Sequence, residues 1–282
     1  MKLTKIAARD FDLRKTLDSG QVFHWECAGS GFAGTIGNRA VYVEQRRQHL
    51  FVSNNSADLV RRYFALDHRL GEICASFPDD AAMNAARDYC RGLRIIRQPK
   101  WECLATFICS SMKQVVHIRQ ISRALRERFG SVRRLSMVRS FRFPSAERLA
   151  RCTEAQLREC ALGYRAKNLL ATARLVASGD ADLENCASLK DVDLRARLCE
   201  LPGVGAKVAN CVMLFAYERL RAFPIDVWIE RVLREKYFAR KRKVTPQTLT
   251  KFAADYFGDH GGYAQQYLFH HARKARRVQP GA

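Results

Sequence analysis

Residues 201–226 read LPGVGAKVANCVMLFAYERLRAFPID, and this stretch decides the fold of the chain around it. Apolar residues at helical spacing precede and follow its Pro-Gly-Val-Gly turn, so the pattern predicts a helix, a tight hairpin and a second helix. Glycines let a backbone approach a phosphate, and the free amides at the start of the second helix attract the anion. We therefore expect Gly203, Val204 and Gly205 to grip a DNA backbone without reading its sequence. The alternative is an ordinary helix–helix connection with a glycine cap.

Two charged residues flank this hairpin. Lys207 lies at a helix start, where the helix dipole disfavours a cation, and Cys211 follows at i+4 on the same face. Pro224 keeps the residue before it extended, which places Asp226 at the N-cap of a further helix. A lysine and a carboxylate around a DNA grip predict an enzyme that acts on DNA. A plain N-cap and a structural salt bridge between Lys207 and Asp226 remain the alternatives.

The composition independently favours a polyanionic partner. The chain has 282 residues, with 49 Lys and Arg against 28 Asp and Glu, and its formal net charge is +21. This excess predicts attraction to nucleic acid, and basic clusters at 240–243 and 273–277 contribute to it. The start lacks an apolar core of signal-peptide length, and no apolar run is long enough to span a bilayer. We expect an intracellular protein that does not contact a membrane.

The chain divides into two compositional parts. Up to about residue 53 the residues alternate as in strands, and Gly37-Asn38 is a hairpin signal, so we expect an antiparallel sheet. Ser56 and Asp79 mark expected helix starts. From about residue 101 nearly everything has helical period, with Ser145 and Thr153 as expected caps. The predicted fold class is α+β, an antiparallel β-sheet domain followed by an all-helical part.

The hairpin, the lysine after it and the Pro-x-Asp that ends at Asp226 resemble the helix-hairpin-helix DNA glycosylases with a lysine nucleophile. The closer resemblance is to the 8-oxoguanine DNA glycosylase/AP lyase family, and it covers nearly the whole chain. Four further segments match that family in the same order: SGQVFHW at 19–25, RQPKWECLATFICSS at 97–111, LGYRA at 162–166 and the pocket segment at 262–269. Such a likeness implies a sheet domain at 1–93 and a two-lobed helix-hairpin-helix domain at 94–282. Within the latter, one lobe at 131–245 carries the hairpin, and 94–130 with 246–282 forms the other.

This resemblance also implies a bifunctional DNA glycosylase/AP lyase of base excision repair. Its substrate would be double-stranded DNA that contains 8-oxoguanine or a related oxidised purine such as formamidopyrimidine-guanine, with the damaged base flipped out of the stack. Lys207 would attack the sugar and form a Schiff base, and β-elimination would then cut 3′ to the abasic site. Asp226 would stay ionised, stabilise positive charge on the sugar and orient the lysine. We expect a monomer, because the reaction needs one cleft.

The family's base pocket maps onto five residues of this chain. Gly20 matches the residue whose carbonyl accepts the N7 hydrogen of the oxidised purine, and Phe23 belongs to the same pocket segment. Phe269 and Cys211 match the residues that sandwich the flipped base, and Gln265 matches the one that bonds its Watson–Crick edge. Taken singly, each has an ordinary explanation as a turn, a core residue or a solvated side chain.

The residues expected against the opposite strand depart from the family pattern. Tyr164 matches the wedge beside the estranged base, and Arg165 matches a contact to the opposite cytosine. In this chain other residues stand in place of the family's asparagine-rich triplet, of a nearby arginine and of the histidine that follows the catalytic aspartate. The replacing residues are Met112, Lys113, Gln114, His117 and Trp228. The resemblance therefore does not by itself imply strict preference for cytosine opposite the lesion in this chain. Met112 either fills the gap that the flipped base leaves or simply ends a helix. Trp228 either reshapes the pocket floor or lies near the phosphate of the lesion.

No cofactor is required for a lysine nucleophile. The resemblance suggests a structural monovalent or divalent cation at the hairpin, held by the carbonyls of Cys199, Leu201 and Val204. The ten cysteines lie scattered, so reduced thiols are expected rather than disulfides or zinc. None follows Cys211, which excludes the C-terminal four-cysteine iron–sulfur cluster of some superfamily members.

The sequence leaves two alternative functions open. One is a helix-hairpin-helix glycosylase for other bases, such as alkylated purines, and Lys207 argues against its purely monofunctional form. The other is a non-catalytic DNA-binding module, which leaves Lys207, Asp226, Gly20 and Gln265 without a joint purpose.

Overall fold

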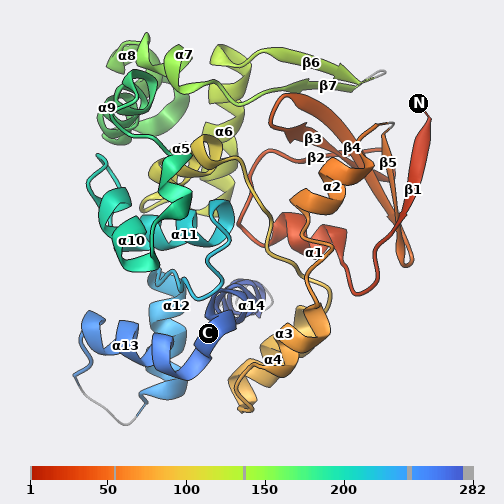
Figure 1. Cartoon of the computed structure of the whole chain (residues 1–282), viewed down its shortest axis with the longest axis vertical. Coiled ribbons are helices and arrows are strands. Elements are labelled where there is room, and N and C mark those ends of the chain that lie inside the picture. The colour runs from red at the N-terminus through yellow and green to blue at the C-terminus, as the bar shows by residue number, and fades with distance from the viewer. Residues whose placement is uncertain (1, 54, 136–137, 240–242, 276–282) are drawn as a thin grey trace.

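An antiparallel sheet forms the N-terminal part, as the alternating pattern predicted (Figure 1). The computed structural model describes residues 2–53, 55–135, 138–239 and 243–275. Residues 240–242 and 276–277 of the two basic clusters lie outside these ranges. The strand order is β1-β5-β4-β3-β2, and Gly37-Asn38 joins β3 to β4 as expected. The strands are β1 Leu3–Ala7, β2 Glu26–Ala28, β3 Gly31–Ile36, β4 Arg39–Arg46 and β5 His49–Ser53.

Four helices accompany the sheet. They are α1 Leu13–Asp18, α2 Ala57–Tyr63, α3 Leu70–Ala75 and α4 Ala81–Tyr89. Ser56 occupies the N-cap position of α2, as predicted. The cap of α4 is Asp80 rather than Asp79, and its carboxylate accepts the amide of Met83. Asp79 instead accepts the side-chain amide of Asn84, so the sequence signal was one residue early.

Helices make up most of the remaining chain. Ser145 and Thr153 are confirmed as caps, the latter in a capping box with Gln156. The longer helices are α5 Lys100–Ser110, α6 Val115–Phe129, α9 Arg165–Ser178, α10 Asp191–Cys199, α11 Ala206–Ala216, α13 Pro246–Phe257 and α14 Gly261–Ala275. The shorter ones are α7 Ala146–Ala150, α8 Glu154–Leu157, η1 Arg158–Leu162, η2 Asn185–Ser188, α12 Val227–Val232, η3 Leu233–Tyr237 and η4 Gly258–His260.

The expectation of an all-helical second part was wrong in one place. Strands β6 Val132–Leu135 and β7 Val138–Phe141 form a hairpin that extends from the helices over the sheet and contacts β3 and β4 (Figure 1). Four-residue strands are too short for a period of two to stand out in sequence. The backbone pairing and the underlying sheet stabilise them instead.

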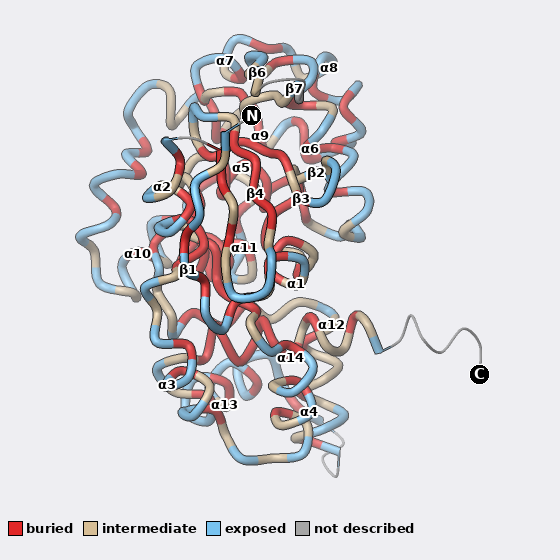
Figure 2. The backbone as a smooth tube through the Cα atoms, turned by 90° about the vertical axis from the view of Figure 1, so that its right-hand side faces the viewer, coloured by how far each residue is buried: buried red, intermediate tan, exposed pale blue. Residues whose placement is uncertain are grey.

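The helices pack in groups, and the expected pairing of 94–130 with 246–282 stays a prediction. Helix α5 packs against α11, α9 and α6, whereas α14 packs against α4, α12 and α13. Nearly every residue of α5 is buried, so this helix needs neighbours on all sides, and α11 and α9 supply them. Figure 2 shows the buried backbone concentrated in the sheet and in these central helices. The boundary at residue 93 stays a prediction.

Candidate active site

The predicted hairpin lies between α10 and α11, and its two glycines serve different purposes. Gly203 has φ +82°, and a Cβ there would lie 2.8 Å from Cβ of Asn168, so the fold itself requires glycine. A Cβ at Gly205 would meet nothing within 4 Å. This exposed glycine precedes the first amides of α11 and leaves the approach to them open.

Lys207 lies half-buried in the first turn of α11, next to α5. Its Nζ donates to Oγ of Ser110 at 3.4 Å and lies 5.2 Å from the ring centroid of Phe107. Phe107 in turn stacks on Phe215 at 5.5 Å. No ion pair within 4.0 Å joins Lys207 to Asp226 among the described residues, which removes the structural salt bridge as an explanation.

Asp226 is the N-cap of α12, as predicted, and its Oδ1 accepts the amide of Ile229 at 2.9 Å. Burial raises the pKa of this carboxyl, while the amide of Ile229 and the charge of Lys207 act in the opposite direction and only partly offset it. Desolvation thus outweighs the groups at the helix N-terminus that favour the ionised carboxylate. The ionised state expected for Asp226 stays a prediction.

Cys211 lies one turn after Lys207 and is buried. Burial raises the pKa of its thiol to about 11, although the nearby charge of Lys207 acts to lower it. The thiol is therefore neutral, which suits packing against a base rather than attack on one. The electrostatic influence of Lys207 on both Cys211 and Asp226 places the three side chains in one cluster.

Gly20 and Phe269 meet across the sheet domain and α14. Gly20 has φ +89°, and a Cβ there would lie 3.0 Å from Cε1 of Phe269. The segment around Gly20 is held by buried amides: Gln266 donates to the carbonyl of Ser19 at 2.8 Å, and Gln21 donates to the carbonyl of Arg94 at 2.8 Å. The structure thus brings together two residues 249 positions apart, Gly20 and Phe269.

Gln265 and Phe23 are both buried near this site. Oε1 of Gln265 has no hydrogen-bond partner among the described residues. A buried acceptor without a partner costs about 1–3 kcal/mol, so it is a natural position for a ligand donor. Phe23 packs edge-on against Phe107 with 6.0 Å between ring centroids, which places it beneath the ring that Lys207 contacts.

The residues expected against the opposite strand gather around one loop. Met112 is 93% exposed and has φ +51°, and Tyr164 is 56% exposed. Arg165 joins them, since its Nε donates to the carbonyl of Ser111 at 2.7 Å and its guanidinium lies 4.3 Å from the Tyr164 ring centroid. Arg165 is itself buried, so its contact with a base stays a prediction, and its observed contacts hold the loop.

Three further predicted residues, Lys113, Gln114 and His117, are exposed on this loop and the start of α6. Trp228 lies apart from them, half-buried in the first turn of α12 beside Asp226. The guanidinium of Arg231 lies 6.0 Å from its ring. Trp228 therefore belongs to the region of Asp226 rather than to the exposed loop.

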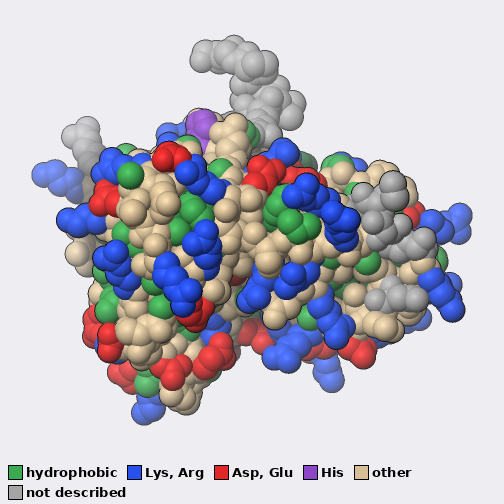
Figure 3. Space-filling model, turned by 90° about the horizontal axis from the view of Figure 1, so that it is seen from above, with side chains coloured by type: hydrophobic (Ala, Val, Ile, Leu, Met, Phe, Trp, Pro, Cys, Tyr) green, Lys and Arg blue, Asp and Glu red, His purple; other side chains and the backbone are tan. Residues whose placement is uncertain are grey.

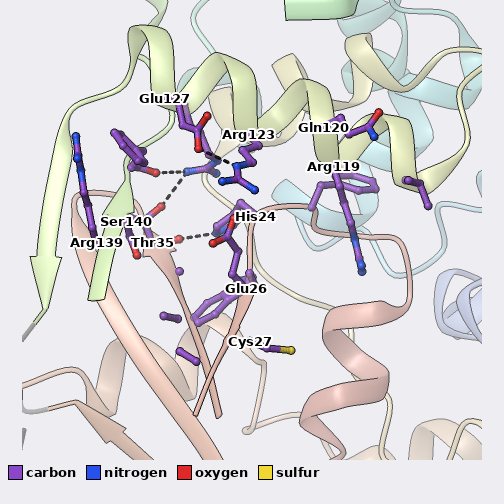
Figure 4. Close-up of a pocket in the computed structure, with 18 residues that line it drawn as sticks. His24, Glu26, Cys27, Thr35, Arg119, Gln120, Arg123, Glu127, Arg139 and Ser140 are labelled. Atoms are coloured by element: carbon purple, nitrogen blue, oxygen red, sulfur yellow. Dashed lines mark hydrogen bonds and ion pairs between the residues drawn. The ribbon is translucent and has the colours of Figure 1, made fainter. Parts of the chain in front are cut away.

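A cavity of about 790 Å³ opens elsewhere, between β2, β3, α6 and β7 (Figure 4). Its polar side chains already bond one another: His24 to the carbonyl of Thr35 at 2.8 Å, Arg126 to the hydroxyl of Thr35 at 2.9 Å, and Arg123 to Glu127 at 2.8 Å. Burial keeps the pKa of His24 well below its ordinary value, so this imidazole is neutral. Neither Lys207 nor Asp226 lines the cavity, and we assign no chemistry to it.

Sequence patterns missed four residues of the site: Phe107, Ser110, Gln266 and Arg273. The first two lie in an apolar helix and look like ordinary core residues. The other two flank the expected pocket residues on α14. Only the spacing of Gln265, Phe269 and Arg273 at i, i+4 and i+8 on one helical face could have pointed to the last of them.

Basic side chains are numerous on the face of the molecule that is seen from above (Figure 3). Figure 3 shows Lys and Arg side chains distributed across one face, with Asp and Glu side chains among them. Across the described ranges, no helix combines the length and the apolar character that crossing a bilayer requires. The net charge of +21 of the chain attracts a polyanion.

Comparison with known families now identifies the chain. Residues 105–255 match the HhH-GPD superfamily of base excision DNA repair proteins, so the fold and the site define a helix-hairpin-helix repair protein. Residues 3–104 match the N-terminal domain of 8-oxoguanine DNA glycosylase. The chain belongs to the 8-oxoguanine DNA glycosylase family of N-glycosylase/DNA lyases.

Individual relatives agree with this assignment. The N-glycosylase/DNA lyase OGG1 of Arabidopsis thaliana is 30% identical over 94% of this chain and 78% of its own length. A structure of MBOgg1 with a low-affinity DNA ligand is 31% identical, has a TM-score of 0.92 and covers 98% of this chain and 100% of that one. The 8-oxoguanine glycosylase/lyase of Clostridium acetobutylicum, solved with DNA that carries cytosine opposite 8-oxoguanine, is 28% identical with a TM-score of 0.90, over 98% of this chain and 100% of that one.

Proposed function

We propose that this protein excises 8-oxoguanine from double-stranded DNA and then cuts the strand at the abasic site, with Lys207 as the nucleophile. One observation carries the assignment to this residue. Lys207 lies half-buried at the start of α11, against Ser110 and Phe107, with no carboxylate paired to it among the described residues. A free amine next to a DNA grip suits attack on a sugar better than it suits structural support.

The bonds change in a defined order. Nζ of Lys207 forms a bond to C1′ as the C1′–N9 bond breaks, and the base leaves with the electron pair and takes up a proton. The sugar ring then opens to an imine between Nζ and C1′. Loss of a proton from C2′ breaks the C3′–O bond, and the 3′ phosphate leaves. Asp226, in the same cluster, stabilises positive charge on the sugar during the first step when it is ionised.

Recognition of the base rests on four residues around Gly20 and α14. The carbonyl of Gly20 accepts the N7 hydrogen, which is present in 8-oxoguanine and absent from guanine. Phe269 and Cys211 hold the two faces of the base, and Phe23 supports the floor through Phe107. Gln265 supplies its buried unpaired oxygen to a donor on the base edge.

The hairpin and the exposed loop contact the duplex on either side of the lesion. Open amides beyond Gly205 bind a backbone phosphate, and Met112 and Tyr164 fill and support the gap on the opposite strand. The related structures solved with DNA support binding of DNA by this fold. The protein acts as a monomer in the compartment that holds the DNA, since one chain carries the whole site.

We also infer a structural cation at the hairpin, bound by the carbonyls of Cys199, Leu201 and Val204. The carbonyl of Leu201 accepts the amide of Val204 at 3.0 Å and keeps a second lone pair for an ion. Such an ion would stiffen the turn and neutralise charge near a phosphate, with no part in the chemistry. Comparison of DNA affinity in potassium, sodium and a bulky organic cation at equal ionic strength tests this inference.

Borohydride reduction tests the proposed reaction. Duplexes carrying one 8-oxoguanine, one alkylated purine or no lesion are incubated with the protein, and adducts are mapped by mass spectrometry of peptides. We expect an adduct with the 8-oxoguanine duplex alone, located at Lys207. An adduct or base release with only the alkylated purine would favour the rival glycosylase. Binding without adduct or strand cleavage on any duplex would favour the non-catalytic module.

A further inference from the structure

Arg273 is a buried arginine in the last turn of α14, four residues after Phe269. Its guanidinium carbon lies 5.5 Å from the centroid of the Phe269 ring, and Nη2 donates to the backbone carbonyl of Asp18. Nη1 would lie 3.2 Å from a Cβ built on Gly20. The Arg273 side chain therefore lies close to Gly20 and to the Phe269 ring, which the proposed function assigns to the edge and the face of the base.

Local charges explain why a buried arginine is stable here. Nη2 lies 3.9 Å from the carboxylate of Asp18, which also pairs with Lys274 and, at 3.0 Å, with Arg119. Burial alone would raise the pKa of Asp18, but these three cations together hold it below its ordinary value. The neighbouring His270 is neutral, because burial lowers its pKa to about 4 and Arg273 acts in the same direction.

The position of Asp18 makes this network relevant to recognition. Asp18 ends α1, and Ser19 and Gly20 follow it directly, so an anchor on the carbonyl of Asp18 sets where the Gly20 carbonyl points. Phe269 lies against Gly20 from α14, with its ring 3.0 Å from the built Cβ. The distance between the Gly20 carbonyl and the Phe269 ring thus depends on how firmly α1 and α14 are joined.

We propose that Arg273 is a positioning residue that fixes the spacing between the Gly20 carbonyl and the Phe269 ring, and thereby sets discrimination of 8-oxoguanine from guanine. This inference rests on the proposed function. With the spacing fixed, the N7 hydrogen of the oxidised purine meets the carbonyl, whereas the N7 lone pair of guanine faces the same oxygen and is repelled. If α1 and α14 are joined less firmly, the hydrogen bond from N7 of 8-oxoguanine to the Gly20 carbonyl lengthens. The repulsion between N7 of guanine and the same carbonyl weakens as well.

The test separates base recognition from the chemistry at the sugar. Arg273→Met keeps a long apolar side chain but removes the charge and the donors, and Arg273→Lys restores a charge with one donor site. Lys251→Met is the control for loss of a cation, because Lys251 is exposed on α13 and pairs with Asp255 instead of Asp18. Single-turnover rates are measured on duplexes with 8-oxoguanine, with guanine and with a preformed abasic site, whose cleavage needs Lys207 but no base pocket.

For Arg273→Met we expect excision of 8-oxoguanine to fall about ten- to a hundredfold, with abasic-site cleavage within about twofold of wild type. The 8-oxoguanine-to-guanine ratio should fall as well, Arg273→Lys should recover part of it, and Lys251→Met should match wild type. An unchanged ratio in Arg273→Met, or parallel loss of both activities with a lower melting temperature, would overturn the proposal. Failure of the proposed function would show separately, as wild-type protein that leaves 8-oxoguanine in place.

Discussion

The two sides of the expected DNA contact are built in different ways. On the lesion side, Lys207, Cys211 and Asp226 come from α11 and the cap of α12, and packed helices shift the pKa of the last two. On the opposite-strand side, Met112 and Tyr164 project into solvent. On the lesion side these three residues match the family pattern and Trp228, beside Asp226, departs from it, whereas on the opposite side most of the departures lie in one exposed loop, at Met112, Lys113 and Gln114. Burial preorganises chemistry, and a buried residue is costly to replace, whereas an exposed loop can change without loss of the fold.

The largest effect is expected from loss of the nucleophile. Lys207→Gln should lower strand cleavage at 8-oxoguanine at least about a thousandfold and abolish the borohydride adduct, because it removes the amine that the proposed reaction uses as nucleophile. Gel assays under single-turnover conditions measure both. The matched control is Lys113→Gln, which removes a lysine from the opposite-strand loop. If both variants lost the adduct equally, the two sides would not be chemically distinct.

Asp226→Asn should lower excision roughly a hundredfold, because it removes the negative charge beside the sugar. The variant should still fold, since an asparagine oxygen can accept the amide of Ile229. Normal excision by this variant would show that Asp226 serves only as a cap.

The raised pKa of Asp226 gives a pH dependence with a definite sign. Excision should fall on acidification through a pKa above the usual value of about 3.9 for aspartate, because the ionised carboxylate is the active form. The effect of this pKa on the stability of the folded protein has the opposite sign. The folded state holds the proton more tightly, so this group contributes stability below the unfolded pKa that is lost as pH rises through the folded pKa. Asp226→Asn should therefore be at least as stable as wild type at neutral pH, as thermal unfolding at several pH values can check.

The opposite-strand side should show a moderate effect. With Met112, Lys113 and Gln114 in place of the family triplet, we expect cytosine opposite the lesion to exceed the other three bases by less than about tenfold in excision rate. Four duplexes that differ in this base provide the measurement, and Met112→Ala should reduce excision on all four alike. A cytosine preference of several orders of magnitude would mean that Arg165 and Tyr164 suffice for strict reading.

The smallest effects distinguish the two glycines of the hairpin. Gly205→Ala should leave the free energy of unfolding within about 1 kcal/mol of wild type, while crowding the phosphate approach and weakening DNA binding about fivefold. Gly203→Ala should lower the free energy of unfolding by about 1–3 kcal/mol, because φ is +82° and Asn168 blocks the added methyl. Chemical denaturation and fluorescence anisotropy report the two quantities. Equal loss of stability in both variants would refute separate purposes.

Local patterns predicted the local structure well. The caps at Ser145, Thr153 and Asp226 and the turn at Gly37-Asn38 are confirmed, because each depends on residues within a few positions. The β6–β7 hairpin was missed, because the surface of the distant sheet stabilises it. The buried environment of Arg165 was missed for the same reason, since its partner is the carbonyl of Ser111, 54 residues earlier.

The sequence by itself determined the hairpin, the lysine after it and the capping aspartate, because periodicity, glycine and proline act over short distances. It also determined that the partner is a polyanion, since net charge needs no coordinates. Only the tertiary structure decided that burial raises the pKa of Asp226, that Lys207 lies free of a carboxylate among the described residues, and that Arg273 joins Gly20 to Phe269. Desolvation and contact between distant segments arise from packing, which short-range patterns do not encode.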